Sequence, residues 1–307
     1  MRRHRIAHHT TYTYDDDVTD SYGMVVARPR DLPGQRVLEH ELWTEPGHAD
    51  LHTHLDSEGN TATYFHVTEP HRRLVVSAVS VVESHVPELP VVERFAAIAW
   101  EDARPLRRRD LPEAAIAAQH AFASPLVDLG PEVAAYAAVS FPPRRPLVEA
   151  VVDLTHRVHE DFDYRPGSTG VATRVPDVLA ARHGVCQDFA HLTIAGLRSL
   201  GLAARYVSGY LATDPPPGRE RVVGADATHA WLEVWVPPEA AAAGAPGWLP
   251  VDPTNDCVTA ERHVTVAWGR DYADVPPVKG VIFTEATEST MDVRVDVAPA
   301  QPRPPRT

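Results

Sequence analysis

Short runs of alternating hydrophobic and polar residues fill the chain from Ile6 to about Val86. The run through Leu38 and Leu42 is an example, and a turn-forming stretch at residues 56–60 separates it from the next. A period of two is typical of strands with one buried face. The pattern therefore predicts an N-terminal β-sandwich over residues 1–90.

The alternation stops near residue 90, where alanine-rich stretches begin. Three of these stretches start around Val92, Pro112 and Pro131, with proline or acidic residues near each start. Proline suits the first turn of a helix, where its missing N–H costs nothing. We therefore expect a connector of short helices over residues 91–145.

Two stronger helices follow. After Pro146, apolar residues recur at helical spacing as far as Phe162, and the next segment, beyond Pro166, is expected to be a loop. The second helix is predicted from about Val185 to Leu200. This prediction places Cys186 at a helix N-terminus.

Three strand-like runs come next, separated by loops rich in Pro, Gly and Ala: Ala203 to Leu211, Ala230 to Val236 and Trp248 to Val251. A helix followed by such runs predicts an antiparallel sheet and an α+β catalytic core over residues 146–275.

The end of the chain alternates again, with apolar residues at every second position from 291 to 297. This pattern predicts C-terminal strands over residues 276–300. The last residues, 301–307, are rich in Pro and Arg, and a disordered tail is expected there.

Charge and cysteine content narrow the function. The chain has 29 Lys and Arg against 42 Asp and Glu, a net charge of −13, which argues against nucleic-acid or anionic membrane partners. Neither a signal peptide nor a membrane span is expected. With Cys186 and Cys257 as the two cysteines, we expect no disulfide framework and a reducing, cytoplasmic location.

Cys186 is the candidate nucleophile. A thiol must lose its proton to react, and a helix N-terminus favours the thiolate by about 0.3–1 kcal/mol. Lowering a thiol pKa by two units takes about 2.7 kcal/mol, so an imidazolium partner is also needed. By itself, Cys186 could equally be a small buried apolar residue at a helix start.

His229 and Asp252 are the candidate partners, at the start and end of two successive predicted strands. Adjacent strands would bring the carboxylate beside the imidazole, where it would orient the ring and stabilise its charged form. Individually, the two could be a surface histidine and a turn-closing aspartate.

The segments around these residues resemble the transglutaminase-like superfamily, in its bacterial form with a β N-terminal domain. The similarity rests on RHGVCQDFAHLTIAGLRSLGLAARYVSGYL (182–211), ADATHAWLEVWVP (225–237) and GWLPVDPTND (247–256), in the order Cys, His, Asp. Residues 162–169 and 267–272 resemble the lead-in and exit segments of the family.

The resemblance implies a papain-like core with Cys186 as nucleophile, His229 as base and Asp252 as orienting residue, and no cofactor. The backbone N–H of Cys186 would bind the oxyanion. Tyr164 and Trp231 are candidates for a second donor, although packing explains either of them.

The expected activity is hydrolysis of a peptide or amide through an acyl-thioester. An acyltransferase that acts on protein glutamine or a γ-glutamyl compound is the alternative, and a non-catalytic binding module is a third reading. Substrate identity and oligomeric state stay open.

Metal binding is not expected. His52 and His54 share a strand face without a carboxylate or cysteine at ligand spacing. Three consecutive aspartates at residues 15–17 lack the glycine and ligand loop of an EF-hand. Cys257 has no nearby base or helix start and is interpreted as structural.

Overall fold

A computed structural model describes residues 1–85, 95, 97–108, 110–212, 228–241 and 247–300. The helix start expected near Val92 and the disordered tail expected at residues 301–307 lie outside these residues.

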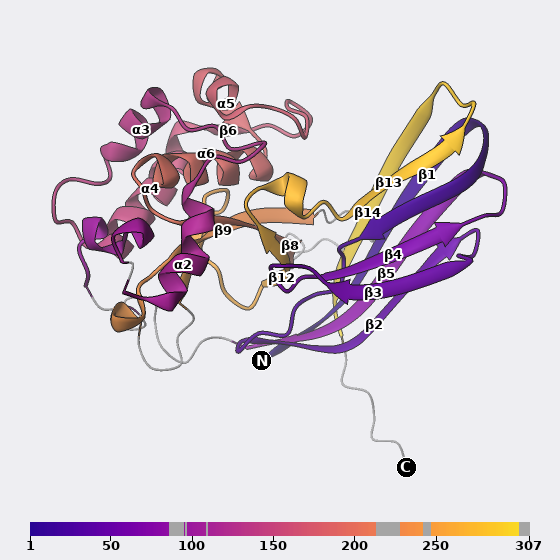
Figure 1. The fold of residues 1–307 in the computed structure, drawn as a ribbon, viewed down its shortest axis with the longest axis horizontal. Coiled ribbons are helices and arrows are strands. Elements are labelled where there is room, and N and C mark those ends of the chain that lie inside the picture. Colours follow the sequence, from indigo (N-terminus) through magenta and orange to yellow (C-terminus); the bar gives the residue numbers. More distant parts are fainter. Residues whose placement is uncertain (86–94, 96, 109, 213–227, 242–246, 301–307) are drawn as a thin grey trace, which may run out of the picture.

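A seven-stranded sheet forms the N-terminal part, with the strand order β2-β5-β1-β4-β3 (Figure 1). The strands are β1 (Arg2–Val25), β2 (Gln35–Glu45), β3 (Asp50–Leu55), β4 (Thr61–Val67) and β5 (His71–Ser84). All its strands share one hydrogen-bonded network through the long strand β1, and the sheet has an apolar cluster of its own around Phe65 and Leu74.

The other two strands of this sheet come from the far end of the chain. Both β13 (Val278–Thr284) and β14 (Ser289–Pro299) pair antiparallel with β1. The alternation in the sequence is confirmed, because Val295 and Val297 are buried on one face. The chain therefore begins and ends in the same sheet.

A five-stranded antiparallel sheet forms the second part, with the order β11-β10-β9-β8-β12. Its strands are β8 (Ala204–Leu211), β9 (Thr228–Trp235), β10 (Trp248–Asp252), β11 (Cys257–Val258) and β12 (His263–Gly269). The three predicted strands are confirmed to within about two residues. Strand β12 was not predicted, and it lies beside β8 at one edge.

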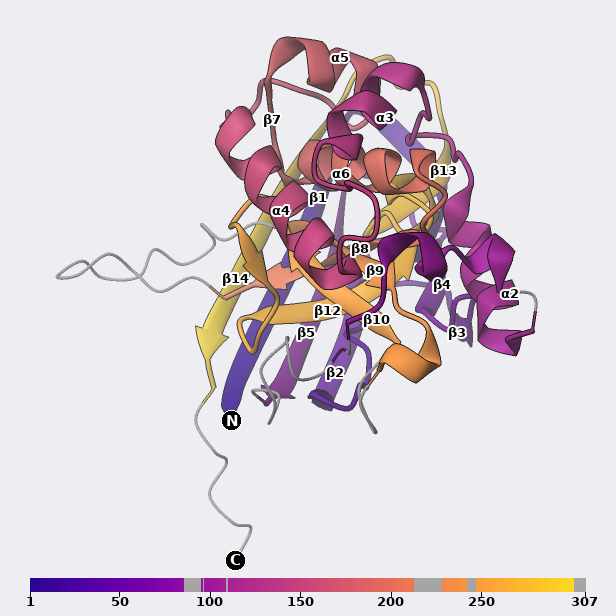
Figure 2. The same cartoon turned by 90° about the vertical axis from the view of Figure 1, so that its left-hand side faces the viewer.

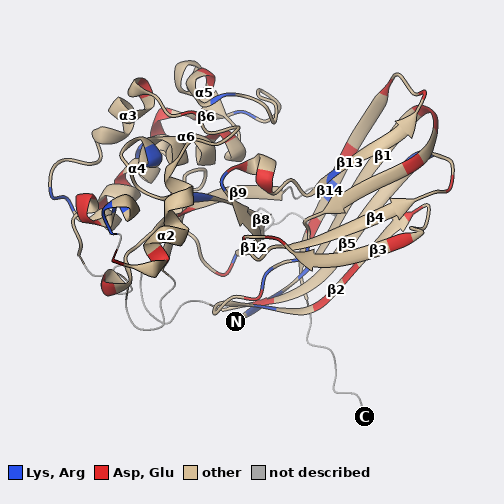
Figure 3. Ribbon diagram, viewed as in Figure 1, with Lys and Arg blue, Asp and Glu red and all other residues tan. Residues whose placement is uncertain are grey.

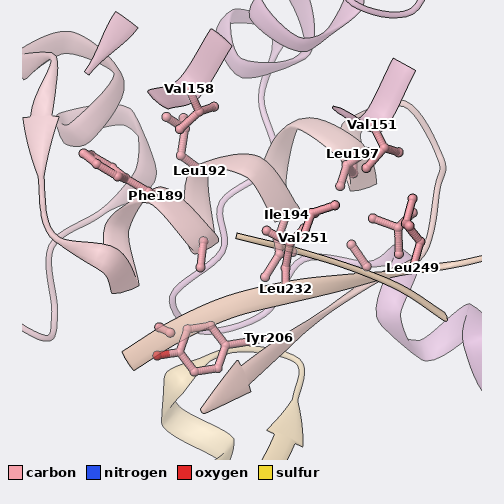
Figure 4. Close-up of a cluster of buried hydrophobic side chains, with 14 of the residues drawn as sticks. Val151, Val158, Phe189, Leu192, Ile194, Leu197, Tyr206, Leu232, Leu249 and Val251 are labelled. Carbon is pink, nitrogen blue, oxygen red and sulfur yellow. The ribbon is translucent and has the colours of Figure 1, made fainter. Parts of the chain in front are cut away.

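Two long helices pack on this sheet, α4 (Leu147–Asp161) and α6 (Cys186–Ser199). Figure 4 shows Leu192 of α6 beside Val158 of α4, and Ile194 of α6 beside Leu232 and Val251 of the strands. These side chains are almost fully buried, so hydrophobic burial holds helix α6, which begins at Cys186, against the sheet.

The remaining elements are short. The helices are α2 (Pro112–Ala118), α3 (Pro131–Ala138) and α5 (Val175–Ala181). The 3-10 turns are Trp100–Ala103, Pro105–Arg107, Gln119–Ala121, Pro238–Ala240 and Tyr272–Asp274. A two-residue strand, β6 (Asp163–Tyr164), pairs in parallel with β7 (His183–Gly184). Both predicted proline starts, at 112 and 131, are confirmed. The loop expected beyond Pro166 is partly wrong, because it contains α5. That helix has only seven residues, too few to show a helical period.

The five-stranded sheet lies between the helices and the N-terminal sheet (Figures 1 and 2). One hydrophobic cluster joins the two parts, because it includes Ile6 and Val297 together with Leu232 and Val264. Polar contacts reinforce the junction: the Gln35 amide donates to the Thr265 carbonyl at 2.8 Å. The N-terminal sheet is therefore packed against the core.

Acidic and basic residues are spread over both parts of the molecule (Figure 3). Among the described residues, no helix combines the length and apolarity needed to cross a membrane.

Candidate active site

Cys186 is the first residue of helix α6, as predicted. The carboxylate of Asp188, which is buried, accepts hydrogen bonds from the Val185 N–H at 2.8 Å and from the Thr169 hydroxyl at 2.6 Å. This side chain caps the helix from within its first turn and ties it to the preceding loop. The Cys186 side chain is half-buried and faces a cleft.

Close packing explains the glycine before the helix. A Cβ on Gly184 would stand 2.8 Å from Oδ2 and 2.9 Å from Cβ of Asp188, closer than side chains approach one another. The turn into the helix at Gly184 therefore depends on the absence of a side chain, since positive φ is not involved here.

His229 lies near the start of β9, and its ring meets the carboxylate at the end of the neighbouring strand β10. The distance from His229 Nε2 to Asp252 Oδ2 is 2.7 Å. Because Nε2 faces the carboxylate, Nδ1 is the ring nitrogen available to Cys186. The antiparallel pairing of β9 with β10 thus brings together residues that are 23 apart in sequence.

Electrostatics favour a charged imidazole at this position. Burial by itself lowers the pKa of His229, but hydrogen bonds and charge interactions with Asp252 and Cys186 outweigh it and raise the pKa to about 10. An imidazolium at neutral pH is the partner that a thiolate requires.

Asp252 is fully buried, yet five donors satisfy it. Its Oδ1 accepts the backbone N–H groups of residues 254 and 255 at 2.9 and 3.2 Å. Its Oδ2 accepts from His229 Nε2, from Asn255 Nδ2 at 2.7 Å and from His263 Nε2 at 3.0 Å. Burial alone would raise the pKa of Asp252, but its side-chain donors hold it well below its usual range.

Two of these donors, Asn255 and His263, were not predicted from the sequence. Asn255 follows Asp252 in an Asp-Pro turn, a setting in which aspartate binds nearby backbone N–H groups, so the turn chemistry could have indicated it. His263 had no such signal, because it begins β12 at the far edge of the sheet. Its proximity depends on how the sheet curves.

The cleft in front of Cys186 has a volume of about 340 Å³ and lies between the two parts of the molecule. Cys186 and His229 line it from the core. Tyr12, from β1, and Met291 and Val293, from β14, line it from the N-terminal sheet. The sheet that opens the chain therefore forms one wall of the candidate site.

Comparison with known proteins identifies the fold family. Residues 137–253 match the model of the transglutaminase-like superfamily, and residues 4–83 match the model of the bacterial transglutaminase-like N-terminal region. An uncharacterized protein of Mycobacterium bovis is 48% identical over 97% of this chain and 93% of its own length. This chain belongs to the transglutaminase-like superfamily.

Other similarities fit this transglutaminase-like chain. A relative from Mycobacterium leprae is 35% identical over 97% of the chain and 99% of its own length. A protein-glutamine gamma-glutamyltransferase of Pseudomonas aeruginosa is 39% identical over 108 residues, which are 34% of this chain and 15% of that protein.

Among solved structures, a cysteine-protease candidate from Cytophaga hutchinsonii superposes with a TM-score of 0.72 at 21% identity. The match covers 99% of this chain and 93% of the other. At this identity the similarity establishes the fold. The predicted transglutaminase-like fold and its α+β class are confirmed.

The two candidates for a second oxyanion donor lie in different environments. Trp231 is fully buried, and its Nε1 has no hydrogen-bond partner. Its ring packs against His263 at 5.2 Å between ring centroids, and Trp231 is not among the described residues that line the cleft. Tyr164 is 53% exposed, and burial, followed by the nearby charge of Cys186, raises its pKa. Tyr164 is therefore close to the thiol, whereas Trp231 does not line the cleft.

One group of described side chains has the spacing of metal ligands. Single ligand atoms of His229, Asp252 and His263 lie within 4.8 Å of one another. Both imidazoles direct a nitrogen at the same carboxylate oxygen, at 2.7 and 3.0 Å. Hydrogen bonding accounts for this geometry without an ion.

The two cysteines are free and differ in environment. Burial, followed by the charge of Asp252, raises the pKa of the Cys257 thiol to about 11. This supports a structural interpretation of Cys257, since thiols need a lowered pKa to act at neutral pH. Cytoplasmic location stays a prediction.

Proposed function

We propose that this transglutaminase-like chain is a cysteine-dependent amide hydrolase with Cys186 as nucleophile, His229 as general base and acid, and Asp252 as orienting residue. The observation that supports this most strongly is the Nε2 to Oδ2 hydrogen bond of 2.7 Å in the His229 and Asp252 pair, with the same imidazole and Cys186 lining one cleft. A nucleophile, a base and an orienting group in contact are the minimum set for acyl transfer to sulfur.

The first half-reaction forms a thioester. The Cys186 thiolate attacks the amide carbonyl carbon, a C–S bond forms, and the carbonyl oxygen becomes an oxyanion. As the tetrahedral intermediate collapses, the C–N bond breaks and His229 Nδ1 gives its proton to the leaving amine. The enzyme is left as a thioester with a neutral imidazole.

Water completes the cycle. The neutral imidazole takes a proton from water as the oxygen attacks the thioester carbonyl, and the C–S bond then breaks. The acid product leaves, and the thiolate and imidazolium are restored. Asp252 keeps its charge throughout and holds the ring in the tautomer that presents Nδ1 to sulfur.

The backbone N–H of Cys186 is our candidate for the oxyanion donor. The first N–H groups of a helix have no partner within the helix, and the helix dipole adds positive potential there. Tyr164 stays the candidate for the second donor, because its hydroxyphenyl group lies close enough to Cys186 for the thiol to influence its pKa.

Acyl transfer to an amine is the second candidate. Two observations favour it: the similarity over 108 residues to a protein-glutamine gamma-glutamyltransferase, and a cleft wall with the apolar residues Val278, Met291 and Val293, which an amine with an apolar stem could contact. Hydrolysis stays our first choice because water is far more concentrated than any amine, and a transferase must exclude it.

Product analysis distinguishes the two reactions. The protein is incubated with glutamine-containing peptides and a primary amine at millimolar concentration, and mass spectrometry measures free acid and amine adduct. We expect mainly acid product, with an acyl adduct on Cys186 as intermediate and no product from Cys186→Ala. A dominant amine adduct would establish the acyltransferase instead, and turnover by the Cys186→Ala variant would refute both.

A further inference from the structure

The cleft wall from the N-terminal sheet is built by strand register. Tyr12 pairs with Met291 and Thr10 pairs with Val293 across β1 and β14, so their side chains share one face. Along β14, the exposed fraction rises from 1% at Val295 to 43% at Val293 and 63% at Met291. This face is therefore packed against the core at one end and open to the cleft at the other.

Apart from the proposed Cys186 and His229 pair, the described lining of this cleft carries no charged side chain. No Asp, Glu, Lys or Arg side chain is among the described residues that form it, and seven of them are Val, Ala, Pro or Met. Its histidine from β1, His8, bonds through Nδ1 to the Tyr210 hydroxyl at 2.8 Å. Burial, and then the neighbouring His9, lower the pKa of His8 to about 4, so this ring is neutral at pH 7.

The thiolate and imidazolium of the proposed pair neutralise each other, so a charged substrate group beside the scissile amide would lose water in this cleft without meeting an unpaired opposite charge among the described residues. Desolvating an unpaired charge is costly, whereas an apolar side chain gains from the same burial. A free γ-glutamyl amino acid carries an ammonium and a carboxylate within a few bonds of its γ-carbonyl. In a peptide both groups are replaced by neutral amides.

We propose that the β1–β14 face selects the substrate: the cleft accepts an amide within a peptide whose side chains next to the reacting residue are uncharged and apolar, and it excludes free γ-glutamyl amino acids. Met291 and Val293 would contact these neighbouring side chains. This inference rests on the proposed acyl chemistry at Cys186 and adds the substrate class to it.

Charged substitutions of Met291, an exposed residue of the cleft wall, test the proposed substrate selection. Peptides with a central glutamine and a flanking Leu, Lys or Glu are compared by kcat/KM for acid release with wild type, Met291→Glu and Met291→Lys. We expect wild type to prefer Leu, Met291→Glu to gain about five-fold on the Lys peptide relative to wild type, and Met291→Lys to gain similarly on the Glu peptide. Free γ-glutamyl amino acids should be turned over least.

Val281 provides the matched control. It is also 63% exposed and lies on β13 of the same sheet, outside the described cleft lining. Val281→Glu and Val281→Lys should leave the peptide ranking unchanged. Equal rankings for all Met291 variants, or shifts of the same size at Val281, would overturn the inference.

Substrate selection by the β1–β14 face and the proposed function can be refuted separately. If wild type turns over none of the peptides and no adduct forms on Cys186, the proposed function fails. If peptides are turned over and the Met291 substitutions leave the peptide ranking unchanged, the proposed function is kept and substrate selection by the β1–β14 face is refuted.

A second observation concerns the carboxylate of Asp252. His263 Nε2 lies 3.0 Å from the oxygen that also accepts from His229. The other ring nitrogen, Nδ1, faces the Ala260 N–H at 3.4 Å and accepts from it. The proton of a neutral His263 must then be on Nε2, which makes the ring a donor to Asp252.

We infer that His263 is a positioning residue that holds the Asp252 carboxylate in the plane where it orients His229. The His263 side chain is 7% exposed and does not line the described cleft. Its loss should therefore lower kcat while KM stays the same, because substrate contacts are untouched.

Two conservative variants separate this role from packing. Glutamine places an NH₂ donor where Nε2 stands, and asparagine places an acceptor where Nδ1 stands. We expect His263→Gln to keep kcat within about three-fold and His263→Asn to lose roughly 10- to 100-fold at constant KM, the range for a lost hydrogen bond to a charged group. Loss in the Gln variant alone, or equal effects in both, would overturn the inference.

The unmodified protein gives an independent readout if a variant does not fold. Nitrogen NMR of ¹⁵N-histidine-labelled wild type should show His263 as the Nε2–H tautomer. An Nδ1–H tautomer for His263 would refute its role as a donor to Asp252.

Discussion

A methyl group on Gly184 would stand 2.8 Å from Oδ2 of Asp188, the carboxylate that caps the helix beginning at Cys186. Gly184→Ala must therefore displace this carboxylate or shift the helix start. We expect a loss of about 1–3 kcal/mol in unfolding free energy, the usual cost of overpacking, with a large loss of turnover. Urea unfolding and amide hydrolysis measure both. Gly170→Ala is the control, since a Cβ there meets nothing within 4 Å, and equal effects at the two glycines would refute the packing argument.

Exchange of each cysteine tests which thiol reacts. Cys186→Ala should abolish turnover and leave the thermal midpoint nearly unchanged, because a small, half-buried side chain is lost. Cys257→Ser should change activity little, since burial raises the pKa of that thiol to about 11. If both folded variants lose activity equally, Cys186 is not the sole nucleophile.

Alkylation reports on the thiolate and imidazolium pair. Cys186 should react with iodoacetamide at pH values well below the reference thiol pKa of about 8.5 and faster than Cys257. His229→Ala should remove this advantage, because the imidazolium is gone. The rate is followed by mass spectrometry between pH 5 and 9. An unchanged pH profile in the variant would mean that the pair does not form.

Asp252→Asn should lower turnover by orders of magnitude while the fold is kept. The amide can hold the imidazole in the wrong tautomer, and the equivalent change in a serine protease costs about 10⁴ in kcat. Asp163→Asn, an exposed aspartate on β6, is the matched control and should be neutral. Near-normal turnover in the Asp252 variant would reduce that residue to a turn former.

Folding stability should depend on His229 at alkaline pH. Its pKa is raised to about 10 in the folded protein from about 6.5 in the unfolded chain, so the folded state binds the proton more tightly. The resulting stabilisation is complete below pH 6.5 and is lost as the pH rises towards 10. Urea midpoints should fall more steeply over this window in wild type than in His229→Gln. His52→Gln, on the exposed strand β3, should follow wild type, and parallel curves for all three would contradict the raised pKa.

Local sequence determined most of the elements around the site. Proline marked the starts of several helices, and apolar spacing indicated the faces of α4, α6 and the central strands. Cys186 at a helix start, with His229 and Asp252 at the ends of neighbouring strands, could be predicted because adjacent antiparallel strands bring such ends together. Helix α5 was missed because seven residues are too short to show a period.

Tertiary structure alone decided what surrounds these three residues. His263 reaches Asp252 from β12, at the opposite side of the sheet order, and nothing in the spacing of the two residues reveals it. The cleft wall combines residues near position 12 with residues near 291, which meet because β14 pairs with β1. Local propensity acts over a few residues, whereas sheet curvature and the pairing of distant strands depend on how the whole chain buries its apolar surface.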